Sequence, residues 1–260
     1  MLPALFVSHG SPAFPLSDVP ARRFLETLAG ELSERPKAIL VVSAHWETER
    51  PTVNSVTVNH TMHDFYGFPK ELYEIRYPAP GSAPLAERVR QLLEEEGMPT
   101  DVDTGRGLDH GAWVPLRLAF PDAHIPVVQL SVQTRLGPRH HLDLGRAMAP
   151  LRAEGVLILA SGSFTHDLSS FREYSRAIDA PEPEWVTSFA DWMEEALADA
   201  RIEELLDYRR LAPEARRNHP TEEHLLPIFV AIGAGGGGAR HLHKSSTHGI
   251  LRMDVYAFGG

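Results

Sequence analysis

Three apolar segments of this chain each lead into a histidine. Only Ser8 separates His9 from the first segment, His45 lies just past the second, and His166 follows the polar turn at residues 161–163 that ends the third. Imidazole is the commonest metal ligand in proteins and the usual acid or base near neutral pH. Three imidazoles in one crevice would suit zinc or iron, whereas each one alone is more often a hydrogen-bonded loop residue. Their chemistry therefore depends on whether the three segments lie side by side.

A second group of histidines lies in residues 219–227. Thr221 is placed to cap a helix that begins here, so that His224 would lie in the first turn and face the site. Pro227 removes a helical hydrogen-bond donor and should bend that turn. The alternative is that His219 and His224 only cap a helix end, and spacing by itself slightly favours this alternative.

Asp109 and His110 are neighbours between a glycine-rich turn and an expected short helix. Such a pair suggests an acid or base oriented by a carboxylate, although adjacency in sequence does not require contact. The remaining histidines lack comparable surroundings. We expect most of them to be solvated or structural: His60, His63, His124, His140, His141, His241, His243 and His248.

The sequence lacks cysteine and the motifs of several other classes of catalytic site. The chain has no cysteine, which excludes disulfides, thiolate metal ligands and a cysteine nucleophile. Residues 161–163 lack the glycine spacing of a nucleophile elbow, and no phosphate-binding loop or dinucleotide-binding glycine motif occurs. The glycine-rich residues 233–238 follow an expected helix rather than a strand, so we interpret them as a flexible loop.

Strands and helices alternate in the predicted order of elements. Short apolar runs predict strands buried on both faces of a sheet over residues 2–7, 38–42, 125–130 and 156–160. Residues 53–58 and 250–258 predict two further strands, the first half-exposed. Apolar residues at helical spacing predict helices over residues 22–32, 85–93, 141–151 and 185–197. The order indicates an α/β fold with a mixed, largely parallel sheet, and ligands of such sheets bind beyond the carboxyl ends of the strands.

Length and charge narrow the class of protein. A chain of 260 residues is near the upper size for one hydrophobic core, and we expect a single domain over residues 1–260. The net charge of −10 argues against a nucleic-acid partner and against an anionic membrane surface. No apolar run approaches the roughly 18 residues that span a bilayer, and the opening residues lack the features of a signal peptide. We therefore expect a cytoplasmic protein without a membrane partner.

Taken together, these motifs resemble those of the class III extradiol ring-cleavage dioxygenases, specifically the DOPA 4,5-dioxygenase-like branch. The matches run in order from residue 8 to about residue 230, and their ordered combination is far more specific than any one of them. The matching strings are Ser8-His9-Gly10-Ser11-Pro12, Ser43-Ala44-His45-Trp46, Asp64-Phe65-Tyr66-Gly67-Phe68-Pro69, Tyr77-Pro78-Ala79-Pro80-Gly81, Leu108-Asp109-His110-Gly111, Gly162-Ser163 with His166, and His219-Pro220 with His224.

The resemblance implies a three-layer α/β/α domain that holds one non-haem metal ion, normally Fe(II), although similar proteins are also found with zinc. It assigns His9, His45 and His224 to the metal. It places His166 and His110 on the substrate side, with His166 as the acid/base. In zinc-bound relatives His166 can count as a fourth ligand, so both roles stay open at this point.

Two further assignments depend on the same resemblance. Many class III enzymes use a glutamate beside two histidines, and Glu223 would take that place if the alignment were shifted by one residue. Trp46, Phe65 and Tyr66 would form the wall of an aromatic pocket, with core packing as the equal alternative for each.

The implied reaction is extradiol cleavage of a catechol by dioxygen, in which the ring opens next to the diol. A cation favours the deprotonated catechol, and histidine suits the proton transfers. Two alternatives remain. One is a zinc-dependent hydrolase that uses a metal-bound water on the same histidines, and the other is a non-catalytic binding protein on this fold.

Overall fold

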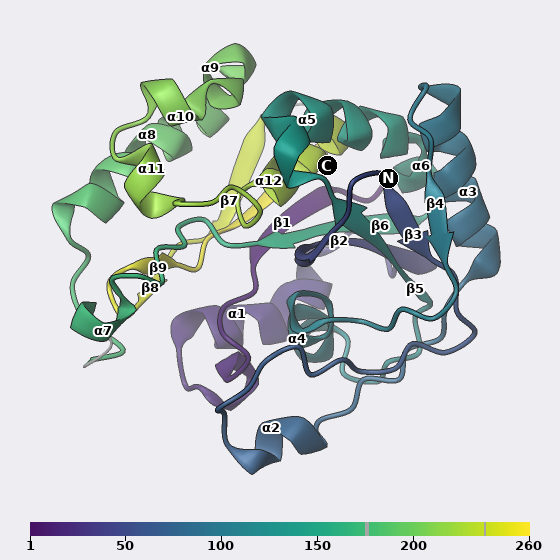
Figure 1. Ribbon diagram of the computed structural model, residues 1–260, viewed down its shortest axis with the longest axis horizontal. Helices are drawn as coiled ribbons and strands as arrows, with labels where there is room; N and C mark the ends of the chain where they lie inside the picture. Colours follow the sequence, from purple (N-terminus) through teal and green to yellow (C-terminus); the bar gives the residue numbers. More distant parts are fainter. Residues whose placement is uncertain (175–176, 237) are drawn as a thin grey trace.

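A mixed sheet forms the middle layer of the molecule, with strand order β4-β3-β5-β2-β6-β1-β10-β7 (Figure 1). The computed structural model describes residues 1–174, 177–236 and 238–260. The strands of this sheet are β1 (Ala4–Ser8), β2 (Ala38–Glu47), β3 (Thr52–Asn54), β4 (Asp101–Asp103), β5 (Val127–Val132), β6 (Val156–Gly162), β7 (Ala239–His243) and β10 (Val255–Phe258). The central strands β5, β2, β6 and β1 are mutually parallel, whereas β10 pairs antiparallel with both β1 and β7, and β3 pairs antiparallel with β5. The predicted mixed, largely parallel sheet is confirmed.

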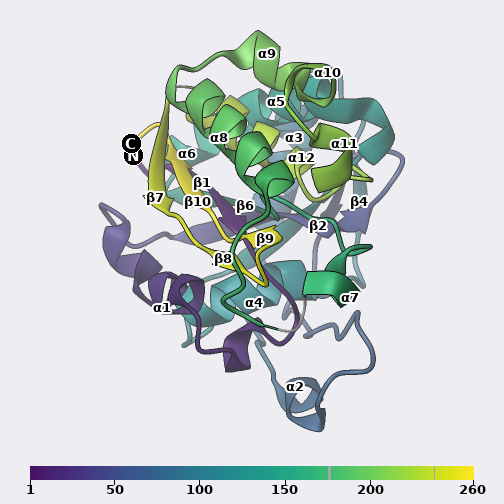
Figure 2. The ribbon, with the colours of Figure 1, turned by 90° about the vertical axis from the view of Figure 1, so that its left-hand side faces the viewer.

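Helices cover both faces of the sheet and complete the three layers that the resemblance implies (Figures 1 and 2). Successive strand residues point to opposite faces, so Phe6 and Leu40 belong to one core, and Leu5 and Ile39 to the other. The first core packs against α3 (Ala83–Glu95), α5 (Gly137–Met148), α6 (Pro150–Ala153), α8 (Glu184–Ala198), α9 (Ile202–Leu206), α10 (Tyr208–Leu211), α11 (Ala215–Asn218) and α12 (Leu226–Gly235). The second packs against α1 (Pro20–Thr27) and α4 (His110–Ala119).

Short elements complete the chain. They are the helices α2 (Lys70–Glu74) and α7 (Phe171–Tyr174), the 3-10 turns η1 (Phe14–Leu16), η2 (Leu28–Glu31) and η3 (Thr134–Leu136), and the hairpin of β8 (Ser246–Thr247) with β9 (Leu251–Arg252).

The prediction of a flexible loop over residues 233–238 is wrong for its first part, because α12 continues to Gly235. A β-carbon at Gly233 would lie 2.1 Å from the carbonyl oxygen of Leu142 on α5, and one at Gly145 would lie 2.2 Å from that of Val230 on α12. The two glycines therefore let these helices touch backbone to backbone, which is a packing role. Gly237 lies outside the described residues.

Three predicted elements are shorter or divided. The helix over 22–32 ends at Thr27 and continues as the 3-10 turn η2, which contains the weak helix former Gly30. The strand over 53–58 stops at Asn54, whose side chain accepts a hydrogen bond from the backbone of Gln129 and donates one to Asn59. The strand over 250–258 is divided into β9 and β10.

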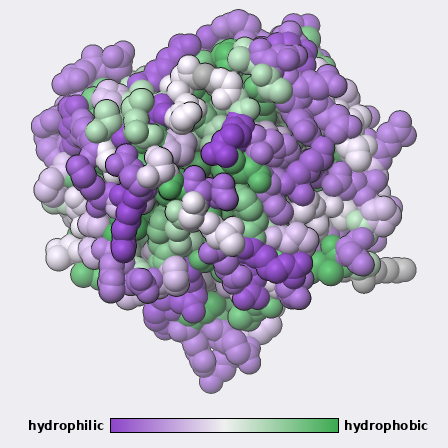
Figure 3. Space-filling view, turned by 180° about the vertical axis from the view of Figure 1, so that it is seen from behind, coloured by the Kyte–Doolittle hydropathy of each residue, from purple (hydrophilic) through white to green (hydrophobic). Residues whose placement is uncertain are grey.

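The surface seen from behind is mostly hydrophilic, with hydrophobic residues gathered near its middle (Figure 3). The two ends of the chain lie close together (Figures 1 and 2), because Ala4 of β1 pairs with Phe258 of β10. Among the described residues, no helix is both long and apolar enough to cross a membrane.

Candidate metal centre

Neighbouring strands bring the first two histidines to one edge of the sheet. β1 and β2 both pair in parallel with β6, so their carboxyl ends meet at the edge where such folds bind ligands. His9 directly follows β1, and its backbone N–H donates to the carbonyl of Gly162 at the end of β6, at 3.0 Å. His45 lies near the end of β2, where the pairing with β5 shifts register between Val42 and Glu47.

His224 reaches the same edge from the turn before α12. Its carbonyl oxygen accepts a hydrogen bond from the backbone N–H of Ser163 at 2.9 Å. A β-carbon at Gly162 would lie only 2.1 Å from that oxygen, so the close approach depends on glycine at the end of β6. The prediction that a helix begins at Thr221 is wrong. α12 starts at Leu226 without a side-chain cap, and the Thr221 hydroxyl bonds Glu223 instead.

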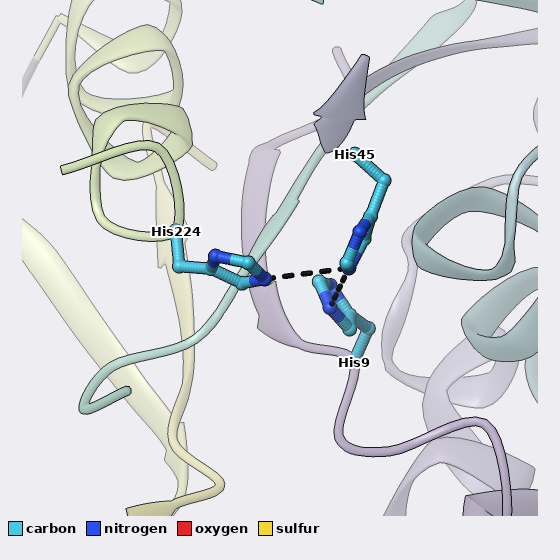
Figure 4. A group of neighbouring side chains, drawn as sticks. All are labelled: His9, His45 and His224. Atoms are coloured by element: carbon cyan, nitrogen blue, oxygen red, sulfur yellow. Dashed lines mark hydrogen bonds between the residues drawn. The ribbon is translucent and has the colours of Figure 1, made fainter. Parts of the chain in front are cut away.

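The three side chains point toward one another (Figure 4). The Nε2 atom of His45 lies 3.0 Å from that of His9 and 3.3 Å from that of His224. An imidazole nitrogen offers one hydrogen or one lone pair, so the Nε2 of His45 does not satisfy both neighbours by hydrogen bonds. Two nitrogens bound about 2.1 Å from one ion lie about 3.0–3.4 Å apart for angles of about 90–109°. The donor set therefore fits a metal ion.

The other ring nitrogens of two of these histidines have partners that fix their tautomers. His9 Nδ1 lies 3.0 Å from the hydroxyl of Ser161, which itself donates to the carbonyl of Gly111. The hydroxyl must then accept from Nδ1–H. His224 Nδ1 lies 3.0 Å from the carboxylate of Glu223. Both arrangements leave the Nε2 lone pair free for a metal, which is the usual role of such supporting groups.

Burial keeps the imidazoles neutral. It is the main cause that lowers the pKa of His9 and of His224 well below the ordinary value, and repulsion from the neighbouring histidines adds to it. The pKa of His45 is lowered to about 3, chiefly by burial and then by His110, against the opposing effect of Asp64. Neutral imidazole is the form that binds metal.

His110 is held by Asp64 and not by its neighbour Asp109. One carboxylate oxygen of Asp64 accepts from the backbone N–H of His110 at 2.9 Å, and the other lies 3.0 Å from its Nδ1. Burial opposes ionisation of Asp64, but its interactions with His110 outweigh burial and lower the pKa of Asp64 to about 2. An ionised Asp64 accepts a hydrogen bond from Nδ1–H of His110, which leaves the lone pair of His110 Nε2 free.

Asp109 is fully buried and accepts hydrogen bonds from residues on both sides of His45 and His110. It caps α4 by accepting from the backbone N–H of Ala112, and it accepts from Ser43 at 2.7 Å and from Arg106 at 3.0 Å. Ser43 in turn accepts from the backbone N–H of His45, and Arg106 donates to the carbonyl of His45. Both backbone groups of His45 are therefore tied to one carboxylate at the point where the strand pairing shifts.

His166 lies beside the three-nitrogen group but does not belong to it. Its ring stacks on that of His224, with centroids 3.5 Å apart and planes 12° apart. Burial lowers its pKa to about 4, with Glu223 opposing. The nearby His219 is buried, and its Nε2 lies 3.0 Å from the carbonyl of Phe164, which is a structural contact.

A cavity of about 530 Å³ opens above the histidines. His9, His45, His110, His166 and His224 all line it. Phe65 and Tyr66 line it as well, beside Phe68, Leu168, Phe171 and Leu251.

Trp46 requires a correction. It is buried, lies outside the cavity lining, and packs under the guanidinium of Arg106 with 4.5 Å between the guanidinium carbon and the ring centroid. Successive strand residues point to opposite faces, so Trp46 turns away from the cavity that His45 faces.

Sequence reasoning missed the supporting residues. Asp64 lies in one of the matching strings, directly before Phe65, but 46 residues separate it from His110. Ser161 and Ser43 were visible only as small polar residues at strand ends. A polar residue in the last positions of a buried strand was the available signal.

Comparison with known proteins places this architecture in a family. The family described as the catalytic LigB subunit of aromatic ring-opening dioxygenase matches residues 3–257. The chain belongs to this family, and the predicted class, an aromatic ring-opening dioxygenase, is confirmed.

Similar proteins within the family cover nearly the whole chain. The chain is 46% identical to a 4,5-DOPA dioxygenase extradiol of Beta vulgaris over 258 residues, which are 97% of this chain and 95% of that protein. It is 39% identical to a protein of the same name from Escherichia coli K12, over 91% of this chain and 86% of that protein. A crystal structure of an uncharacterized Escherichia coli K12 protein matches all of both chains, with a TM-score of 0.79 and 32% identity. The resemblance to the DOPA dioxygenase-like branch is confirmed, and these matches do not support a hydrolase or a binding protein.

Proposed function

We propose that this chain acts over its full length as one catalytic domain that opens the ring of a catechol by extradiol cleavage at an Fe(II) ion. The observation that carries the proposal is the convergence of three neutral imidazole Nε2 atoms at the floor of a cavity with an aromatic wall. The names of the most similar relatives support the extradiol outcome. Both atoms of dioxygen enter the product, a ring-opened semialdehyde acid, so no further reductant is required.

His9, His45 and His224 would hold the ion, and their supporting partners keep each Nε2 lone pair directed inward. When bound, Fe(II) supplies binding positions for the catechol oxygens and dioxygen and the redox chemistry that opens the ring. Zinc would fit the same nitrogens but has no redox chemistry.

Two further histidines are available for the protons. His110 has an ionised Asp64 on Nδ1, so its Nε2 is placed to accept a phenolic proton. His166 lines the cavity on the other side and stacks on His224, where it can return a proton to the opened product. The stacking favours an acid/base role for His166 over that of a fourth ligand, because its ring lies flat on a ligand ring.

The aromatic wall would orient the ring. Phe65 lies edge-on to His110, with centroids 5.9 Å apart and planes at 89°. A planar catechol would pack against this wall with its hydroxyl groups toward the histidines, and its burial in the cavity would remove water from the reacting atoms.

The test is oxygen uptake with 4-methylcatechol by protein purified without oxygen and loaded with Fe(II). We expect one oxygen consumed per catechol and the yellow absorbance of a semialdehyde product. Zinc-loaded protein should bind the metal and show no uptake. Equal uptake with zinc, or ester hydrolysis without uptake, would contradict the proposal.

A further inference from the structure

A buried ion pair lies where the chain passes from β9 to β10. The guanidinium of Arg252 donates from Nε to one carboxylate oxygen of Asp254 and from Nη2 to the other, at 2.8 Å each. The two side chains are 1% and 0% exposed. Apolar side chains of similar volume in place of such a pair are often neutral or stabilising. Stability alone therefore does not account for two charges at this position.

The backbone of Asp254 holds the residue that precedes the ligand candidate His9. The carbonyl oxygen of Asp254 accepts from the backbone N–H of Ser8 at 3.2 Å and from the Ser8 hydroxyl at 3.0 Å. The same hydroxyl oxygen accepts from the backbone N–H of Phe164 at 3.2 Å. Regular pairing of β1 with β10 ends at Val7, so these bonds fix the chain at the point where it leaves the sheet.

The backbone of Arg252 holds the residue that precedes His166. Its N–H donates to the hydroxyl oxygen of Thr165 at 2.8 Å, and that hydroxyl donates to the carbonyl of Ile250 at 2.8 Å. Residues 250–254 therefore bond both to the residue before His9 and to the residue before His166.

The ion pair fixes these two attachment points relative to each other. A bidentate bond between guanidinium and carboxylate restricts both distance and orientation, and here it joins the residue whose N–H holds Thr165 to the residue whose carbonyl holds Ser8. His241 on β7 strengthens the arrangement, because its Nε2 lies 2.8 Å from the Oδ1 atom of Asp254.

We propose that Arg252 and Asp254 are positioning residues of the metal centre, which set the places of His9 and His166 through Ser8 and Thr165. Neither Arg252 nor Asp254 lines the cavity, so both act through other residues. This inference rests on the proposed function and deepens it. Groups that orient metal ligands from outside the ligand set commonly contribute 10–100-fold to metal affinity or activity.

The first test is Arg252→Met, which removes the ion pair and keeps much of the side-chain volume. We expect the affinity for Zn(II) to fall by about 10–100-fold. The visible spectrum of the Co(II)-loaded protein should change as well, because its bands depend on the arrangement of the nitrogen donors. Arg252→Lys keeps the charge but has no planar fork, so its affinity should lie between those of Arg252→Met and the unaltered protein.

Arg152→Met is the matched control. Arg152 is 5% exposed, and it donates to the carbonyls of Leu2 and Ala234 near the other end of β1. Urea unfolding should show a loss of stability in both Met variants, whereas the Zn(II) affinity and Co(II) spectrum of Arg152→Met should stay within about twofold and unshifted. Equal losses of affinity in the two variants, or no loss in Arg252→Met, would overturn the inference.

Ser8→Ala is a smaller change that decides the question even where Arg252→Met does not fold. It keeps the ion pair and removes the hydroxyl that joins Asp254 to Phe164, so Zn(II) affinity should fall by about tenfold, the lower end of the usual range. Thr100→Val is its control, since that buried hydroxyl bonds only the nearby carbonyl of Met98. Unchanged affinity in Ser8→Ala, or an equal fall in Thr100→Val, would contradict the inference.

Metal binding separates this inference from the proposed function, because neither Zn(II) affinity nor the Co(II) spectrum depends on ring cleavage. The expected loss of affinity in Arg252→Met, in a protein that shows no oxygen uptake with any catechol, would support the positioning role and refute the proposed function. Ring cleavage by the unaltered protein, with the same metal affinity and turnover in Arg252→Met, would overturn the positioning role and leave the proposed function intact.

Discussion

The position of one proton on each imidazole decides what the histidines of this site are able to bind. Ser161 and Glu223 each accept a hydrogen bond from a Nδ1–H group, of His9 and His224 respectively, so the Nε2 lone pairs of these two histidines are free and face the same point. Asp64 does the same for His110. In the proposed function the same residue type would therefore serve as ligand in one place and as base in another, because of its partners and its position.

Substitution should distinguish ligand from acid/base. His45→Ala removes a nitrogen that faces two others, and we expect metal affinity to fall by more than about 100-fold, beyond the usual loss of a supporting group. His166→Ala should retain its metal while turnover falls by about 10²–10⁴-fold, the usual contribution of a positioned acid or base. Metal content and turnover are measured on the same preparations. Loss of metal from His166→Ala would make His166 a ligand and leave His110 as the base.

Gly162→Ala tests the close approach that positions His224. The added methyl group would lie 2.1 Å from the carbonyl oxygen of His224, so the turn must move at a cost of about 1–3 kcal/mol, and metal affinity should fall. Gly30→Ala is the control, because a β-carbon there meets nothing within 4 Å. Metal titration and urea unfolding of both variants check the prediction, and unchanged metal affinity in Gly162→Ala would contradict it.

At the scale of elements, the end of β2 and the start of α4 share one support. The sheet stops pairing regularly where His45 must leave it, and Asp109 replaces the lost partners through Ser43 and Arg106. The same carboxylate caps the helix whose first residue is His110. The end of β2, which contains His45, and the start of α4, which contains His110, are thereby fixed relative to each other.

Asp109→Ala should disturb both elements at once. It removes a helix cap, worth about 1 kcal/mol, and leaves Arg106 without its buried partner, a loss of about 3–5 kcal/mol in comparable pairs. We expect the free energy of unfolding to fall by several kcal/mol and metal affinity by about 10–100-fold. Asp109→Asn should lose less of both stability and metal affinity, since its amide oxygen still accepts hydrogen bonds from Ser43 and Ala112.

Asp143→Ala is the matched control for the unfolding measurement. Its ion pair with Arg146 on α5 is exposed, so removing it should change stability by no more than about 0.5–1 kcal/mol. A loss in Asp109→Ala no larger than in this control would refute the supporting role.

Across the whole molecule, the buried histidines make the metal-free protein sensitive to acid. Burial lowers the pKa of His141 to about 4 and that of His219 to about 3, against hydrogen bonds to Gly137 and Phe164. Below about pH 6.5, the ordinary pKa of histidine, these side chains become protonated in the unfolded chain but stay neutral in the folded chain. The free energy of unfolding should therefore fall from pH 6.5 to about pH 4, by up to about 1.4 kcal/mol per pH unit for each such histidine.

His141→Gln provides the check, because an amide keeps a donor for Gly137 and an acceptor for the backbone of Gln133 without titrating in this range. Chemical unfolding of the metal-free protein at several pH values should show a shallower slope for this variant. His124→Gln, at an exposed position, should keep the slope of the unaltered protein. A His141→Gln slope equal to that of the unaltered protein would contradict the assignment.

The pattern of apolar and polar residues predicted the sheet, and the histidines that follow its strands supplied the ligand candidates. Apolar runs that end in polar turns specify buried parallel strands, because burial on both faces leaves only the strand ends for polar residues. The place of His9 and His45 at one edge of the sheet was predictable for that reason. His224 and the family required the ordered motifs as well.

The residues that support the histidines and those that line the cavity follow from the packing of distant segments. Asp64 and His110 are 46 residues apart, and Ser161 and His9 are 152 apart, so no local pattern links either pair. Trp46 illustrates the converse, since its neighbour His45 faces the site while strand alternation turns the indole away. The spacing of residues along a strand or helix determines the face on which a side chain lies. The packing of distant segments determines which residues that side chain contacts.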